Sequence, residues 1–177
     1  MERKAELEQV RSICKEFVRN WLCYSKAVDI DAKDSGTLPI VICNNFFDIA
    51  LLNWAHLFGG SGSNHFHYEN VIGDNAAFKA TLLQKLSISE SEFDYDVSEL
   101  KRFRDKRVAH MDKIPRVMVP SFDVALKSVS EYYEIATKEL ESLGVSPLFH
   151  KKIEVFVQEN REYYDTQIEK ILEISQS

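Results

Sequence analysis

The apolar residues of this sequence recur at steps of three and four, and this period constrains the fold more than any other feature. The cleanest example lies between residues 122 and 143, where the apolar positions are Phe122, Leu126, Val129, Tyr133, Ala136, Leu140 and Leu143. Such steps place side chains on one face of an α-helix. No stretch has the period-two alternation and the turn residues that are typical of a β-hairpin. The sequence therefore predicts an all-α protein, an antiparallel bundle of about five or six helices.

Similar signals delimit the other helices. The predicted helices span residues 2–29, 39–58, 75–86, about 95–112, 121–143 and 146 onward. Pro39 is tolerated in a first helical turn, and Asp94 or Asp96 is the expected cap of the fourth helix. The acidic, serine-rich residues 87–94 are interpreted as a connection. Because residues 39–58 are apolar nearly all round, we expect that helix to lie in the core.

The length and composition fit one domain that covers residues 1–177. Hydrophobic residues make up 45% of the 177 residues, and there are only four prolines. This is enough for a single core and unlike the composition of a disordered chain. The formal charge of −6 argues against nonspecific coating of nucleic acid, but it does not exclude a local basic site.

The cysteines and the hydropathy pattern predict a cytoplasmic protein with no membrane partner. Cys14, Cys23 and Cys43 show no CxxC spacing, and no secretory signal is recognisable at the N-terminus, which suits a reducing compartment. We expect these thiols to lie in or near the core. The most apolar run, residues 38–58, is interrupted by Asn44, Asn45, Asp48 and Asn53. It is therefore interpreted as a buried helix and not as a membrane span.

The densest charge lies in residues 98–113. Five of the seven residues from Lys101 to Arg107 are basic, and His110 follows one turn later. A basic helix end that carries a histidine is common, because cations suit the C-terminal end of the helix dipole. The particular order Arg-Asp-Lys-Arg-Val-Ala-His is what suggests a function.

This segment resembles the HEPN superfamily of small helical domains. The ribonuclease members of that superfamily carry an arginine and a histidine separated by four to six residues, and here five residues separate Arg104 from His110. Asp105 is similar to the polar residue that often follows the arginine. Trp54 and Phe58 are similar to a Trp-x-x-x-Phe segment of the abortive-infection branch. The resemblance covers roughly residues 40–140 and implies a HEPN-like bundle.

The resemblance also implies an activity. It indicates a metal-independent endoribonuclease that leaves a cyclic phosphate and acts as a toxin or phage-defence effector. His110 would transfer protons, Arg104 would position the phosphate or stabilise the transition state, and Asp105 would orient Arg104. These residue types suit the task, because histidine titrates near neutrality and arginine is a permanent, bidentate phosphate partner. We expect RNA as the substrate, an antitoxin or defence-system partner, and neither cofactor nor metal.

The spacing of the motif predicts a homodimer. Six residues along an ideal helix leave Arg104 and His110 about 120° apart and about 9 Å apart along the axis. In the family, two such motifs meet across a two-fold axis and form one composite cleft. Arg107 lies on the same helix face as His110 and is an expected substrate ligand. The other expected phosphate contacts are Lys106, Arg102, Lys101 and Lys113.

Two other functions compete with this prediction. The first is a non-catalytic helical module that uses the same bundle to dimerise or to bind a protein or nucleotide. The second is a metal site at His65 and His67, since an extended His-x-His places both imidazoles on one side. Glu69, Asp74 or His56 would complete that site. Nothing in the sequence identifies the RNA target or the physiological role.

Overall fold

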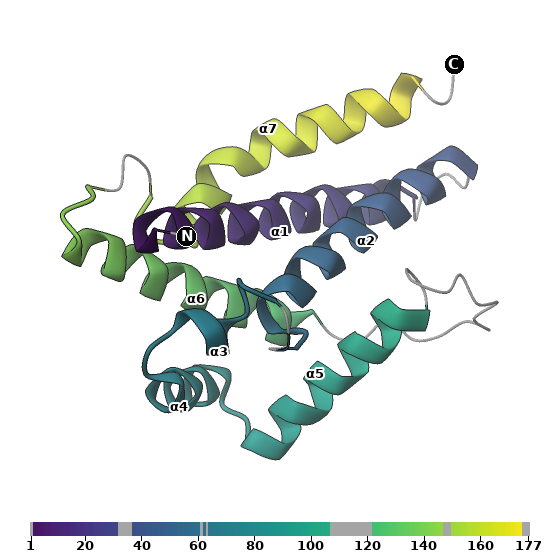
Figure 1. Ribbon diagram of the computed structural model, residues 1–177. Helices are drawn as coiled ribbons and strands as arrows, with labels where there is room; N and C mark the ends of the chain where they lie inside the picture. The colour runs from purple at the N-terminus through teal and green to yellow at the C-terminus, as the bar shows by residue number, and fades with distance from the viewer. Residues whose placement is uncertain are drawn as a thin grey trace.

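Seven helices make up the part of the chain that the structure describes. The computed structural model describes residues 2–31, 37–60, 62, 64–106, 122–146 and 150–174, and these residues contain no strand. The helices are α1 (Arg3–Asp31), α2 (Thr37–Phe58), α3 (Tyr68–Val71), α4 (Asn75–Leu86), α5 (Glu90–Arg104), α6 (Asp123–Ser142) and α7 (Ile153–Ile174) (Figure 1). The all-α prediction is confirmed. The helix beyond the expected five or six is α3, which at four residues is too short to show a period.

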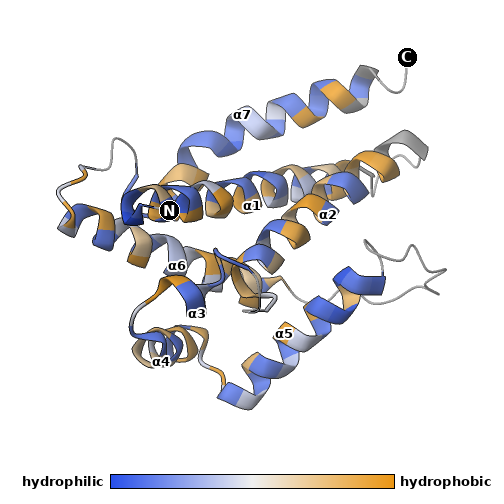
Figure 2. Ribbon diagram, viewed as in Figure 1, coloured by the Kyte–Doolittle hydropathy of each residue, from blue (hydrophilic) through white to orange (hydrophobic). Residues whose placement is uncertain are grey.

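Helix α1 is the centre of the packing. It packs against α2, α6 and α7, and α2 returns alongside it in the opposite direction (Figure 1). The predicted apolar face of α1 is confirmed, since Leu7, Val10, Cys14 and Phe17 are buried in the main core. Figure 2 shows that α2 is the more apolar partner of this pair and that α5 is largely hydrophilic. The bundle is therefore organised around α1, with α5 at its edge.

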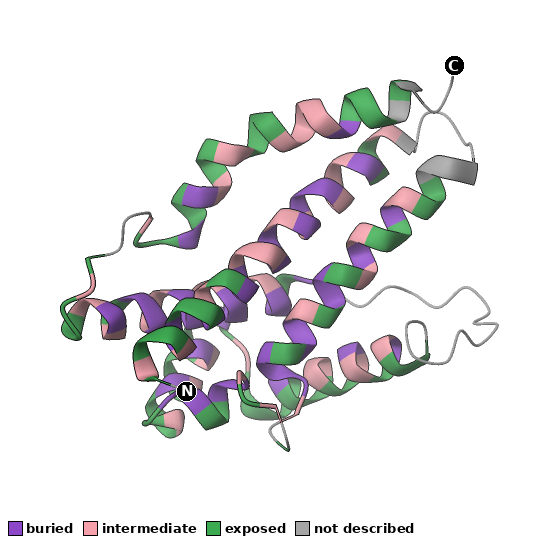
Figure 3. Ribbon diagram, turned by 45° about the horizontal axis from the view of Figure 1, so that its top comes forward, coloured by how far each residue is buried: buried purple, intermediate pink, exposed green. Residues whose placement is uncertain are grey.

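Helix α6 is held mainly by burial. Ten of its 20 residues are buried, including Tyr132, Tyr133 and Leu140. Figure 3 shows the burial class of each described residue along the ribbon. The predicted apolar face is confirmed for most of its positions, but Leu143 is 51% exposed. Leu143 lies just beyond the end of α6 at Ser142, where Gly144 adopts a left-handed φ of 75° and reverses the chain.

An arginine near the N-terminus joins α1, α6 and the end of α3. The Nε atom of Arg3 donates a hydrogen bond of 2.6 Å to Oε1 of Glu139, and its Nη2 donates one of 2.7 Å to the carbonyl oxygen of Val71. The hydrogen bond with Glu139 raises the pKa of Arg3 against the opposing effect of burial. These contacts fix the outer end of α6 on α1.

Helix α5 begins five residues before the predicted start at about residue 95. Ser89 is its N-cap, and its hydroxyl accepts from the backbone N–H of Glu92 while the Glu92 carboxylate accepts from the backbone N–H of Ser89. Hydrogen bonds that the Ser89 hydroxyl and the Ser89 backbone N–H donate to the Glu92 carboxylate lower the pKa of Glu92. The predicted caps Asp94 and Asp96 lie inside the helix, so the interpretation of residues 87–94 as a connection was wrong. The reciprocal capping box explains the earlier start.

Helix α7 begins later than predicted. Ser146 lies outside a helix, and α7 starts at Ile153. The carbonyl oxygen of His150 accepts a hydrogen bond of 2.8 Å from the hydroxyl of Tyr133, so the backbone before α7 is engaged with α6. Residues 147–149, which the prediction placed in the first turn of this helix, lie outside the described residues.

One face of α2 is exposed, contrary to the expectation of a helix buried all round. Ile40, Val41, Ile49 and Leu52 are between 39% and 46% exposed. The segment Ile40–Phe58 is long and apolar enough to cross a membrane by length and composition alone, and 39% of it is buried inside the protein. Core helices of soluble proteins pass the same test, so this segment by itself does not indicate a membrane protein.

The three cysteines are free and buried, as predicted. Cys14 lies in the main core, and Cys23 and Cys43 lie in a smaller cluster where α1, α2 and α7 meet. Burial raises the pKa of the Cys23 thiol to about 11 and that of the Cys14 thiol further. Both thiols are therefore protonated at neutral pH.

Candidate functional site

The basic residues of the predicted motif gather at the C-terminal end of α5. Lys101, Arg102 and Arg104 occupy its last turn, and Lys106 follows the C-cap Asp105, whose backbone N–H donates to the carbonyl oxygens of Arg102 and Lys101. Two predicted site residues, Arg107 and His110, lie outside the described residues, as does the remainder of the predicted 95–112 helix. The described part of the candidate site consists of residues 101–106 and the side chains that pack around them.

The guanidinium of Arg104 is held by its neighbour in sequence. Its Nε donates a hydrogen bond of 2.8 Å to Oδ1 of Asp105, and its Nη2 donates one of 2.5 Å to the same oxygen. The Arg104 side chain is 26% exposed and that of Asp105 is 52% exposed. The pair therefore combines a fixed orientation with access from solvent.

The other side of the same guanidinium lies close to Gly59. A Cβ atom added at Gly59 would lie 3.0 Å from Nη1 of Arg104, and 2.5 Å from the carbonyl oxygen of Ala55. The backbone N–H of Gly59 donates to that carbonyl at 2.9 Å, which closes the last turn of α2. Only a residue without a side chain permits Arg104 to lie this close to the end of α2.

The remaining basic residues of α5 differ in their surroundings. Arg102 is exposed and forms an ion pair of 2.5 Å with Glu99 one turn earlier. Lys106 is exposed, and Lys101 is half-buried beside Gly60, where an added Cβ would lie 3.9 Å from its Nζ. The acidic residues Glu90 and Asp94, at the other end of α5, bind Lys79 of α4. Lys79 thus offsets part of their charge, and both carboxylates lie away from the basic end.

Aromatic packing positions this end of α5. The ring of Phe103 meets that of Phe47 edge to face, with centroids 5.6 Å apart. Trp54 and Phe58 stack below the site with centroids 6.1 Å apart, and Trp54 donates to the Ser128 hydroxyl at 3.4 Å. Both are buried, so they support the site from the core and do not contact solvent.

A histidine that the functional prediction did not use lies beside Lys101. His67 is 3% exposed, and its Nδ1 accepts from the backbone N–H of Glu69 as the N-cap of α3. Burial lowers its pKa, against a hydrogen bond to the Phe58 backbone that raises it. With Nδ1 engaged in the cap and the ring close to the Phe58 backbone, His67 acts as a clip between the ends of α2 and α3. Its burial keeps the imidazole from contact with solvent.

The His-x-His pair does not form a joint site. His65 is exposed while His67 is buried, and the two imidazoles line different pockets. Within the described ranges, no group of three or more His, Cys, Asp or Glu side chains is arranged to hold a metal ion. The sequence pattern indicated proximity, but the N-cap role of His67 turns it inward.

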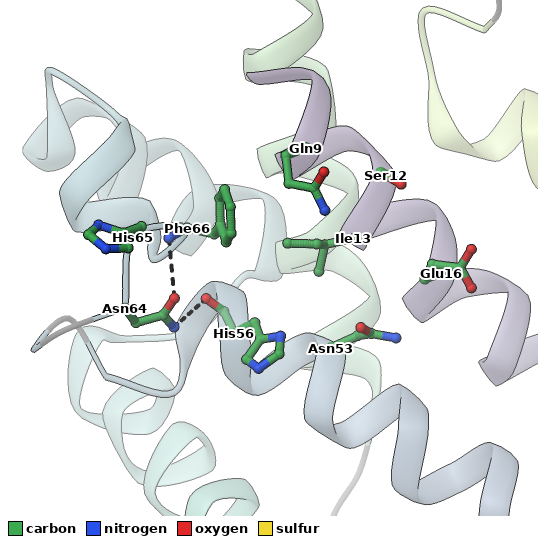
Figure 4. Close-up of a pocket in the computed structure, with 9 residues that line it drawn as sticks. All are labelled: Gln9, Ser12, Ile13, Glu16, Asn53, His56, Asn64, His65 and Phe66. Carbon is green, nitrogen blue, oxygen red and sulfur yellow. Dashed lines mark hydrogen bonds between the residues drawn. The ribbon is translucent and has the colours of Figure 1, made fainter. Parts of the chain in front are cut away.

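A groove lined by both polar and apolar side chains lies on the other side of the α2 end. It has a volume of about 500 Å³ and is lined by α1, α2 and the segment before α3 (Figure 4). The side chains that give it its chemical character are those of Gln9, Ser12, Asn53, His56, His65 and Phe66. We call it the α1–α2 groove. Sequence analysis did not detect it, because its residues come from three segments with no shared motif.

The geometry provides a fixed, solvent-accessible guanidinium and further cations at one end of a helix, which is an arrangement suited to binding phosphate. Comparison with known proteins adds no assignment: no protein-family model, no curated protein and no solved structure matches the chain.

Proposed function

We propose that this protein is a metal-independent endoribonuclease of the HEPN type, with a HEPN-like bundle and a composite active site in a cytoplasmic homodimer. Arg104 binds the scissile phosphate and stabilises its developing charge. His110 moves protons between the ribose 2′-hydroxyl, the phosphate and the leaving oxygen. Arg102, Lys106 and Arg107 contact neighbouring phosphates. The product carries a cyclic phosphate, and the cellular role is that of a toxin or phage-defence effector.

The observation that carries this proposal is the immobilised guanidinium of Arg104. Asp105 holds it through two nitrogens, and Gly59 lets it rest against the end of α2. Donors that are fixed before the reaction stabilise transition-state charge more effectively than donors that must first reorganise.

The dimer is part of the proposed mechanism, because in the family two such motifs meet across a two-fold axis and form one composite cleft. Exposed apolar side chains on α2, among them Val41, Ile49 and Leu52, support self-association. They also favour the second candidate function, a non-catalytic module that dimerises or binds a partner. Cleavage assays separate the two functions.

The decisive experiment incubates the purified protein with total RNA and tRNA in EDTA. We expect cleavage with cyclic phosphate ends, and a loss of about 10²- to 10⁴-fold in Arg104→Ala and His110→Ala. Arg161→Ala is the matched control, because Arg161 is an exposed arginine on α7, and it should cleave like the wild type. If the wild type is as inert as both variants on every RNA, the ribonuclease is rejected and the binding module takes its place.

Mixing the two inactive variants tests the composite site. A heterodimer of Arg104→Ala and His110→Ala retains one Arg104 and one His110 in the shared cleft, so partial activity should return. If mass spectrometry detects the heterodimer and no cleavage returns, the two residues do not cooperate across a two-fold axis.

Asp105→Asn tests the orientation of Arg104. The amide removes the charge that holds the guanidinium, so we expect about a hundredfold slower cleavage with little change in stability. Glu99→Gln is the matched control, because Glu99 forms the comparable ion pair with Arg102 one turn earlier. Equal effects of the two substitutions on single-turnover rates would contradict a special role for Asp105.

A further inference from the structure

The α1–α2 groove contains polar side chains that are not committed to the fold. Five side chains that line this groove form no hydrogen bond within the described part of the chain. They are those of Gln9, Ser12, Asn53, His56 and His65. Figure 4 shows Gln9 and Asn53 on facing walls. Each carboxamide offers a donor and an acceptor side by side. Groups of this kind that converge on one cavity are typical of a binding site.

Hydrogen bonds fix the backbone that forms one wall of the groove. Asn64 donates from Nδ2 to the carbonyl oxygen of His56 at 2.5 Å, and its Oδ1 accepts from the backbone N–H of Phe66 at 3.2 Å (Figure 4). These bonds place the Phe66 ring at the edge of the groove. The backbone carbonyl of Phe66 also accepts from the Tyr132 hydroxyl at 3.1 Å, which ties this wall to α6. The groove is therefore preformed.

The charges of the groove exclude a phosphate as its main ligand. Its one fixed charge among the described lining residues is Glu16, whose carboxylate forms an ion pair with Arg19. The cations needed for phosphate lie instead at the end of α5. A neutral ligand with several hydrogen-bonding edges and a flat face fits the carboxamides and the Phe66 ring. A nucleobase has these properties.

We propose that the α1–α2 groove binds a nucleobase of single-stranded RNA, and this inference rests on the proposed ribonuclease function. Proteins read unpaired RNA bases by stacking them on aromatic side chains and by hydrogen-bonding their edges. Asn and Gln side chains form paired hydrogen bonds with base edges. The groove and the arginine lie at the same end of α2: a Cβ added at Gly59 would lie 3.0 Å from Nη1 of Arg104, and Asn64, which lines the groove, donates to the carbonyl oxygen of His56. The groove thus gives the cleavage site a preference for the base that it holds.

The test titrates the full chain with adenosine, guanosine, cytidine and uridine in turn, followed by NMR of the side-chain amides. Ribose 5-phosphate is the probe without a base. We expect at least one nucleoside to shift the Asn53 and Gln9 side-chain resonances, and ribose 5-phosphate to leave them in place. Asn53→Ala should weaken nucleoside binding about tenfold, the effect of one paired hydrogen-bonding contact. Asn45→Ala is the matched control, since Asn45 is an exposed asparagine on the same helix outside the groove.

The outcomes of this titration are separable from those of the cleavage assay. If no nucleoside shifts these resonances, or if Asn53→Ala binds nucleosides as the wild type does, the base site is overturned even when RNA is cleaved. If ribose 5-phosphate produces the same shifts, the groove recognises sugar phosphate and the proposal is wrong. If nucleosides bind as expected while no RNA is cleaved, the result supports the base-binding site and rejects the ribonuclease function.

Discussion

Helices α5 and α6 are positioned in opposite ways. Half of α6 is buried and no side chain caps its N-terminus, so its place is determined by packing against the rest of the bundle. Among the 15 residues of α5 only Phe93, Leu100 and Phe103 are buried, yet it has a complete capping box. The first helix is positioned by extensive burial, whereas the second combines a strong local cap with only a few buried contacts, such as that between Phe103 and Phe47.

This difference indicates which helix can carry solvent-exposed functional residues. Cations at the end of α5 repel one another and need access to solvent, which a deeply packed helix could not provide. Binding elements are generally drawn from the less stable parts of a structure. The cap at Ser89, the Gly59 contact and the His67 clip secure α5 and its surroundings without burying the basic end. Each of these devices can be removed singly.

The largest effect is expected from the packing of α6. Leu140→Ala removes a fully buried side chain and should lower the free energy of unfolding by about 2–5 kcal/mol. Leu143→Ala is the control, because Leu143 is 51% exposed and its loss should change stability by less than about 0.5 kcal/mol. Urea unfolding followed by circular dichroism measures both. If both variants lowered the free energy of unfolding equally, burial would not distinguish Leu140 in the packed helix from Leu143 at its exposed end.

Gly59→Ala tests the contact between α2 and the end of α5. The new methyl group would meet backbone atoms of Ala55 at 2.5 and 2.9 Å as well as Arg104, so we expect a loss of about 1–3 kcal/mol. Cleavage by the variant should fall more than its stability explains, since Arg104 must move. Gly73→Ala serves as the comparison, because nothing lies within 4 Å of its added Cβ. If Gly59→Ala were as stable as the wild type, the end of α2 would accommodate the added methyl group without a loss of stability.

Ser89→Ala tests the local stabilisation of α5. Loss of the cap should cost about 1 kcal/mol and increase hydrogen exchange in the first turns of α5, with α6 unaffected. Ser98→Ala, within the same helix, removes only a hydroxyl that bonds to the carbonyl oxygen of Tyr95, and should leave exchange at the start of α5 unchanged. If Ser89→Ala increased exchange equally in α5 and α6, the two helices would unfold as one unit.

The smallest effect concerns the His67 clip and depends on pH. Burial lowers the pKa of His67 below its ordinary value of 6.5. The unfolded chain therefore binds the proton more readily, so the stability from neutral His67 is present above pH 6.5 and is lost as pH falls through the lowered pKa. His67→Asn keeps a capping acceptor but does not titrate. Urea midpoints between pH 8 and 5 should fall more for the wild type than for this variant, and parallel curves would reject the clip.

The features that were predictable from sequence are those that a single segment encodes. The buried face of α1 follows from its period, and α4 spans residues 75–86 as predicted, because Asp74 caps its first turn and Ser87 ends it in a left-handed conformation. The start of α5 was encoded too, in Ser89 and Glu92, but the acidic composition of that stretch suggested a connection.

What escaped prediction depends on contacts between distant residues. Gly59 and Arg104 are 45 positions apart in sequence, and no local pattern indicates that they touch. The inward turn of His67 depends on the end of α2, and the α1–α2 groove combines three segments. The neighbours Arg104 and Asp105 could be singled out because they are adjacent in sequence. Their mutual hydrogen bonds are a structural observation.

The burial of the three native cysteines makes the protein convenient for spectroscopy. Their thiols are buried, and burial keeps those of Cys14 and Cys23 protonated, so maleimide reagents should react with them slowly. A cysteine introduced at Tyr95, which is 64% exposed on α5, would react with ordinary kinetics. Fluorescent or paramagnetic labels can thus be attached to α5 without replacing the native cysteines. Pulsed dipolar spectroscopy on such a sample would then measure the separation of the two α5 helices in a homodimer.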